Sequence, residues 1–221
     1  MRLEEYTADA ICKAMALPAF IEQTWTSAEN PVLRVLLTPS FHPEVCITMT
    51  RAGDETHLTI VALRKMLWTE DIWRVLPVQL AETELPASAF EEVVHLFKDM
   101  RTAFDPNHRI VFCDGMGSES CMVSRSCVER LRTQVMKQFG IAAFIGRVLE
   151  MSWQSCAQTP VANAVAHAGR YVGLEYPLQQ PSAEPESARV MVLGAEQERN
   201  EYLEMLRLRK QTLKLKPPSK S

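Results

Sequence analysis

Two short segments of the sequence carry the side chains that are best suited to chemistry. Residues 40–45 read Ser-Phe-His-Pro-Glu-Val, and residues 114–117 read Asp-Gly-Met-Gly. His42 could serve as a general acid or base or as a hydrogen-bond donor, with Asp114 as its partner. Such a pair works only if both side chains reach one pocket, so the hypothesis requires the two segments to converge. Under this hypothesis, the protein is a small-molecule-binding domain or an enzyme, and its site lies at the Phe-His-Pro loop and the Asp-Gly turn.

Other familiar chemistries find little support in the sequence. The turn at 114–117 contains Gly-x-Gly, as phosphate-binding loops do, but Asp114 and Glu119 place negative charge there and oppose phosphate binding. Cys113 ends an apolar run, and burial raises the pKa of a thiol and leaves it inert. The sequence contains no Gly-x-Ser-x-Gly, Ser-x-x-Lys, His-Glu-x-x-His or Cys-x-x-Cys motif. We therefore assign no catalytic residue and expect no metal and no cofactor.

Two tryptophans and an arginine lie close together between two predicted strands. They are Trp68, Trp73 and Arg74. Tryptophan and arginine are enriched where protein partners dock, so these residues could form a docking loop. The competing interpretation is a tryptophan pair that folds onto the sheet. Both interpretations stay open at this point.

The C-terminal residues hold the largest charge asymmetry. The chain has 24 Lys and Arg against 27 Asp and Glu, a net charge of −3. Residues 205–221 carry six positive charges and no acid, which leaves −9 on the remainder. This arm could pack on the body or on a second subunit, contact nucleic acid, or stay solvated, and we favour packing, with a homodimer as one form. Nucleic acid is the weaker choice because residues 205–221 contain no aromatic side chain for base stacking. The candidate contact residues lie on these positions and on the end of the predicted helix that precedes them, and they are Tyr202, Leu206, Arg207, Arg209 and Lys210.

Hydrophobic periodicity predicts the elements that must position these residues. Strand-like patterns lie at 32–37, 45–51, 56–65, 72–80, 109–113, 119–124 and 141–151. Helical patterns with capping residues lie at 7–17, 88–104, 127–139 and 160–173. The loop at 52–55 closes a hairpin, and its length predicts a register that sets Arg51 opposite Thr56 and Thr50 opposite His57.

Strands in adjacent hairpins predict an α+β fold with an antiparallel sheet flanked by amphipathic helices. We expect the α+β domain at 1–176, a proline-rich linker at 177–189, and a C-terminal helix with a basic tail at 190–221. No apolar run reaches the ~18–20 residues of a membrane span. The first residues do not have the pattern of a signal peptide, so we expect a cytoplasmic protein.

Three short motifs resemble those of a group of uncharacterised bacterial proteins. These motifs are Ser40 to Val45, the Asp114-Gly115 turn, and Met151-Ser152-Trp153. The group has a Phe-His-Pro motif beside a strand, then an Asp-Gly turn, then a strand ending near Trp-Ser-Pro. This chain departs from it at Glu44, which replaces a proline, and in the Ser-Trp order. The group has no settled activity, so the resemblance implies a bacterial cytosolic protein. By analogy with companions of secreted toxins, an immunity or adaptor protein is one form it could take.

The leading hypothesis is a non-enzymatic protein that works through protein–protein contact. An acidic body, a basic arm and the lack of a convergent catalytic set motivate it. We predict that removal of residues 186–221 changes the oligomer size or the capture of a partner. Light scattering and a pull-down on the truncated and full-length chains measure both. Unchanged results in both assays would argue against a role for the arm.

Overall fold

One antiparallel sheet of six strands organises the described part of the chain, in the order β4-β3-β2-β1-β5-β6. The structure is a computed structural model, and it describes residues 7–21, 30–67, 76, 78–103, 115–125, 127–135 and 140–179. The strands are β1 Val32–Pro39, β2 Val45–Ala52, β3 Glu55–Leu63, β4 Val78–Pro86, β5 Met116–Ser124 and β6 Cys127–Gln134. The helices are α1 Ala8–Ala14, α3 Ala87–Ala103, α4 Ile141–Cys156 and α5 Ala162–Tyr171. The predicted α+β class is therefore confirmed.

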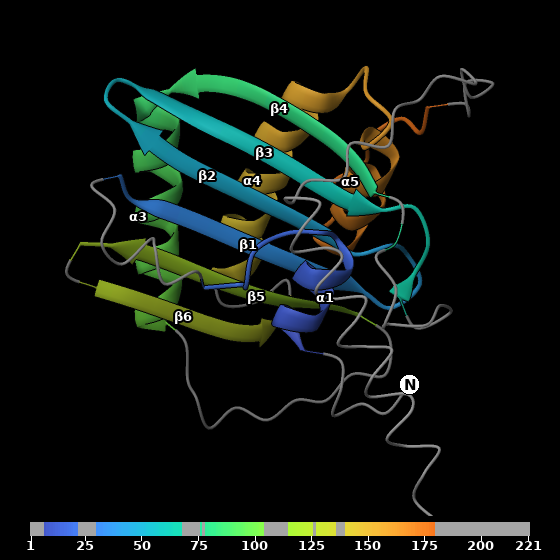
Figure 1. Cartoon of the computed structure of the whole chain (residues 1–221), viewed down its shortest axis with the longest axis horizontal. Helices are drawn as coiled ribbons and strands as arrows, with labels where there is room; N and C mark the ends of the chain where they lie inside the picture. The colour runs from blue at the N-terminus through green and yellow to red at the C-terminus, as the bar shows by residue number, and fades with distance from the viewer. Residues whose placement is uncertain are drawn as a thin grey trace, which may run out of the picture.

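The sheet is a four-strand meander to which a second hairpin is added at β1 (Figure 1). Strands β1 to β4 follow one another as antiparallel neighbours. After α3, the chain returns to pair β5 with the free edge of β1, and β6 then pairs with β5. The predicted hairpin register is confirmed, because Thr50 pairs with His57 and Arg51 with Thr56.

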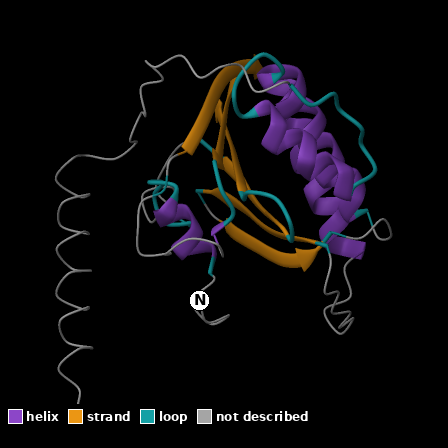
Figure 2. Ribbon diagram, turned by 90° about the vertical axis from the view of Figure 1, so that its right-hand side faces the viewer, coloured by secondary structure: helices purple, strands orange, loops and turns teal. Residues whose placement is uncertain are grey.

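The two faces of the sheet carry different layers (Figure 2). Helices α3, α4 and α5 cover one face, and the short helix α1 lies on the other. Alternate residues of β1 point to each side, because side chains alternate along a strand. Leu33 and Val35 join the core under the three helices, whereas Leu36 joins the smaller core under α1. No helix among the described residues is long and apolar enough to cross a membrane.

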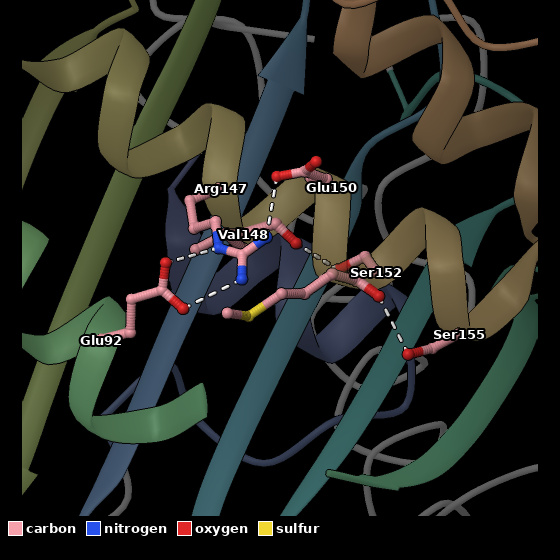
Figure 3. A network of polar contacts seen from close by, with 7 residues as sticks. Glu92, Arg147, Val148, Glu150, Ser152 and Ser155 are labelled. Carbon is pink, nitrogen blue, oxygen red and sulfur yellow. Dashed lines mark hydrogen bonds and ion pairs between the residues drawn. The ribbon is translucent and has the colours of Figure 1, made fainter. Parts of the chain in front are cut away.

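An ion-pair network joins α3 to α4 on the outer side of the helical layer (Figure 3). The Arg147 guanidinium binds both carboxylate oxygens of Glu92 on α3, at 2.7 and 2.9 Å, and donates to Glu150 on α4 at 2.8 Å. All three side chains are partly solvent-exposed, so the pairs contribute no more than about 1 kcal/mol each. Their main effect is to orient α4 against α3.

The chain after α5 folds back along the helical layer. Tyr176 stacks on Trp153 of α4, with ring centroids 4.8 Å apart and an interplanar angle of 11°. The Asn163 side chain then pairs with the backbone of Gln179, donating to its carbonyl at 3.0 Å and accepting from its N–H at 2.7 Å. The segment up to Gln179 is therefore fastened to the first turn of α5.

The predicted helix at 127–139 is wrong in its described part, because Cys127–Gln134 forms strand β6. The side chains follow period two: Leu131 packs against the core under the helices, and Arg130 lies over the Phe20 ring on the opposite side. Pairing with β5 along the whole of β6 satisfies the backbone and outweighs the local capping pattern.

The predicted strand at 141–151 is also wrong, because Ile141–Cys156 is helix α4. Its buried residues recur at helical spacing and face the sheet. These residues are Ile141, Phe144, Ile145, Val148, Leu149, Met151, Ser152 and Cys156. The core under the helices is therefore completed by a helical stripe rather than by a further strand.

The remaining element predictions differ less from the structure. The helices predicted at 7–17, 88–104 and 160–173 are confirmed as α1, α3 and α5, with small differences at their ends. The strand predicted at 72–80 overlaps β4 only at 78–80, and β4 continues to Pro86 because the whole of it pairs with β3. Residues 72–75 and 77 lie outside the described residues. The predicted strand at 109–113, the end of the linker and the basic arm lie outside the described residues.

We predict opposite effects of the same substitution at two glycines. Gly53 has a φ of +62° in the β2–β3 turn, so Gly53→Ala should cost about 1 kcal/mol in the free energy of unfolding. Gly146 lies inside α4, and a Cβ there would meet only Leu174 at 3.9 Å. Gly146→Ala should therefore stabilise by up to about 1 kcal/mol. Urea unfolding measures both variants, and changes of equal sign would contradict the prediction.

Candidate functional site

The loop between β1 and β2 is tied to the start of β5 by Ser40. The Ser40 hydroxyl donates to the Gly115 carbonyl at 2.7 Å and accepts from the Gly115 N–H at 3.0 Å. The Ser40 backbone N–H donates to the same carbonyl at 2.9 Å. This pairing follows directly from the ladder between β1 and β5, in which Pro39 lies opposite Met116. The loop that carries His42 therefore has a fixed base.

The His42 side chain is held by α5. Its ring stacks on His167, with centroids 4.1 Å apart and an interplanar angle of 22°. Its Nδ1 lies 3.2 Å from the Tyr171 hydroxyl, and the Tyr171 ring meets it edge-on. His167 and Tyr171 are four residues apart in the helix, so both project from one face of α5 toward the loop.

Positive charge and burial both act on the two imidazoles. Partial burial is the main cause that lowers the pKa of His42 below its usual 6.5, and the nearby Arg170 guanidinium lowers it further. Burial, then His42, then Arg170 lower the pKa of His167. The His167 Nδ1 is buried and has no hydrogen-bond partner among the described residues. The pair is therefore neutral at pH 7.

Phe41 projects into solvent beside this pair. It is 62% exposed, the most exposed of the three large apolar side chains that stand out from the described surface. The other two are Val128 at 45% and Leu178 at 43%. We call the set of Phe41, His42, His167, Arg170 and Tyr171 the Phe41 surface.

Neither the stacked histidines nor another described cluster makes a strong metal centre. Each imidazole directs its lone pair in its own ring plane, and two nearly parallel rings 4.1 Å apart do not aim both pairs at one ion. On the opposite part of the sheet, Glu55, His57 and Glu84 place one ligand atom each within 4.8 Å of one another. All three residues are exposed, and acidic surface groups of this kind are common without an ion.

The structure describes only part of the predicted site. Gly115, the second residue of the predicted Asp-Gly turn, contacts Ser40 at the start of the loop that carries His42. Asp114 itself lies outside the described residues, and so do Trp68, Trp73, Arg74 and the arm residues. Four of the five described cysteines are buried, and only Cys127 is exposed.

Sequence reasoning missed three residues of the Phe41 surface, namely His167, Arg170 and Tyr171. All three belong to a helix that was predicted, but they lie off its apolar stripe and were not considered. A histidine and a tyrosine spaced by four residues on a predicted helix were the available signal. That spacing alone does not show which loop the pair meets.

Buried polar groups on the α1 side of the sheet have structural partners. Arg34 is 3% exposed, and its guanidinium donates to the Thr48 hydroxyl at 3.1 Å and to the Ala19 carbonyl at 3.0 Å. The fully buried Glu44 accepts from the Leu67 N–H. Burial raises the pKa of the neighbouring Cys121 to about 12, so this thiol is unreactive. These groups have structural roles around α1 and are not available to bind a ligand. The Phe41 surface is therefore the better candidate for a binding site.

Comparison with known proteins found nothing similar. No protein-family model matches the chain, and neither the curated proteins nor the solved structures include a match. Function must therefore be argued from the geometry of this chain.

We predict that the His42–His167 pair makes the fold less stable in acid. Because both pKa values are lowered in the folded chain, the unfolded chain binds more protons below about pH 6.5. The free energy of unfolding is then highest above the unfolded pKa and falls as pH drops toward the folded values. Between about pH 7.5 and 5.5, this fall should be smaller in H42Q/H167Q than in the wild type.

Chemical denaturation at a series of pH values measures the effect. His57→Gln is the matched control, because His57 is exposed and lies beside Glu84 rather than in the stack. An identical pH dependence of the wild type and H42Q/H167Q would contradict the prediction.

Proposed function

We propose that the protein works by binding another protein, and that the Phe41 surface is the binding site. The observation that carries this proposal is the exposure of Phe41 at the tip of a loop that is held from two sides. An exposed aromatic side chain on a fixed support is the usual form of a binding anchor.

The supports of the loop lower the cost of binding. Ser40 ties one side of the loop to Gly115, and His42 is packed between His167 and Tyr171 on the other. A loop that is already ordered loses little conformational entropy when a partner docks. Phe41 can then contribute most of the free energy that its burial releases.

The residues around Phe41 suit the rim of an interface. Arg170 is exposed, and His42, His167 and Tyr171 are each partly exposed. Tyrosine and arginine are enriched at interfaces, and a polar rim around an apolar anchor excludes water from its contact.

A small-molecule site is the second candidate, and the contact of Ser40 with Gly115 favours it. That contact supports this candidate because it joins Gly115, which follows Asp114 in the sequence, to the start of the loop that carries His42. The two candidates differ in their dependence on Phe41, because a small molecule held by His42 would not need a side chain that points into solvent. Native mass spectrometry of the wild type and of His42→Ala tests this candidate through a retained ligand that the variant loses.

For protein binding, we predict that Phe41→Ala weakens partner capture at least about tenfold. Immobilised full-length protein is incubated with an extract of the source organism, and the bound proteins are quantified by mass spectrometry. The expected result is a partner that the wild type retains in stoichiometric amount and that Phe41→Ala loses.

Val128→Ala is the matched control, because it also removes an exposed apolar side chain but lies on β6. It should capture the partner as the wild type does. Equal capture by Phe41→Ala and the wild type, or no stoichiometric partner for the wild type, would overturn the proposal.

A further inference from the structure

We propose that the partner places a carboxylate on the Phe41 surface, where His42, His167 and Arg170 receive it. This inference rests on the proposed function and specifies the chemistry of the partner: an acidic protein segment that carries an apolar group for Phe41.

The charged groups that act on the stacked pair are all basic. Arg170 of α5 acts on both rings, and His42 acts on His167. The acid nearest in sequence, Glu44, is buried and turned to the Leu67 N–H. Tyr171 contributes a neutral hydroxyl. Among the described residues, no carboxylate therefore acts on either imidazole.

The other two described histidines have a carboxylate next to them. His57 Nδ1 lies 3.6 Å from a Glu84 oxygen, and His95 Nε2 lies 3.4 Å from an Asp99 oxygen. His42 and His167 instead lie against each other and near an arginine. In a chain with more acids than bases, this local excess of bases marks a place where a carboxylate from outside would be stabilised.

The hydrogen-bonding groups suit a carboxylate. A guanidinium can hold a carboxylate with two parallel N–H groups. When the Tyr171 hydroxyl donates to His42 Nδ1, the proton of the neutral ring is on Nε2, which can donate as well. A bound carboxylate would also favour the protonated imidazoles, so binding would take up protons and would be tighter in mild acid.

A protein carboxylate fits this surface better than a nucleic acid does. A net charge of −9 outside residues 205–221 opposes a polyanion. A single carboxylate beside an apolar side chain needs only the few bases of the Phe41 surface and the Phe41 ring, and no extended positive surface.

The test uses the full-length protein with ¹³C-labelled histidine and three probes, followed by NMR. The probes are the peptide Ac-Gly-Glu-Leu-Glu-Gly-NH₂, the same peptide with both Glu replaced by Gln, and inorganic phosphate. The Glu peptide should raise the pKa of both His42 and His167. It should bind at least about fivefold more tightly at about pH 6 than at about pH 8, and the Gln peptide should show no such change.

Two variants separate a direct role in peptide binding from an effect on the fold. Because Arg170 is exposed, Arg170→Gln should leave the fold intact. It should weaken the binding of the Glu peptide at both pH values. His57→Gln should bind as the wild type does. Equal binding of the Glu and Gln peptides, no binding of the Glu peptide, or phosphate binding as tight as that of the Glu peptide would overturn the inference.

The failure of this inference can be told from the failure of the proposed function. If Phe41→Ala loses its partner but the Glu peptide changes the pKa of neither histidine, the Phe41 surface binds a protein, and the inference of a bound carboxylate is wrong. If Phe41→Ala keeps the partner while the Glu peptide binds as expected, the surface receives carboxylates without serving that partner.

Discussion

The pairing of β1 on both of its edges is the constraint on which the rest of the structure depends. β1 lies between β2 and β5, and its side chains enter both cores. Because β5 arrives after α3 and must align with β1, the register of that ladder decides which residues meet at the end of the sheet. It brings Gly115 to Ser40, so the loop that carries Phe41 starts from a strand that is paired on both edges.

The helical layer then supplies the other half of the site. α5 lies at the end of the sheet where β1 passes into β2 (Figure 1). From this position, His167 and Tyr171 contact the loop. The stacked imidazoles pack the loop against α5 in the place where two apolar side chains could otherwise do so. A histidine pair of this kind packs as neutral rings but can still take up protons, which an aliphatic pair could not.

The sequence predicted the first half of the fold well because that half is built from local hairpins. Between Ile47 and Ile60, period-two burial and the turn at 52–55 determine the register, so Thr50 and His57 could be paired without a structure. Residues 127–156 were misassigned because Leu131 and Ile141 have side chains that suit either element, and only the free edge of β5 and the open face of the sheet decide between them. His42 was recognised as part of a chemical motif. Its partner His167 was not, because their contact depends on where α5 packs.

The clamp between Asn163 and Gln179 also has a mechanical consequence. A pull on the chain beyond Gln179 would first load two hydrogen bonds and the stacked Trp153–Tyr176 rings. These contacts lie at the start of α5 and on α4, away from the turn of α5 that meets His42. A force on the C-terminal residues would therefore break these contacts before it disturbed the stacked histidines. The loop that carries Phe41 would keep its conformation as long as these contacts hold.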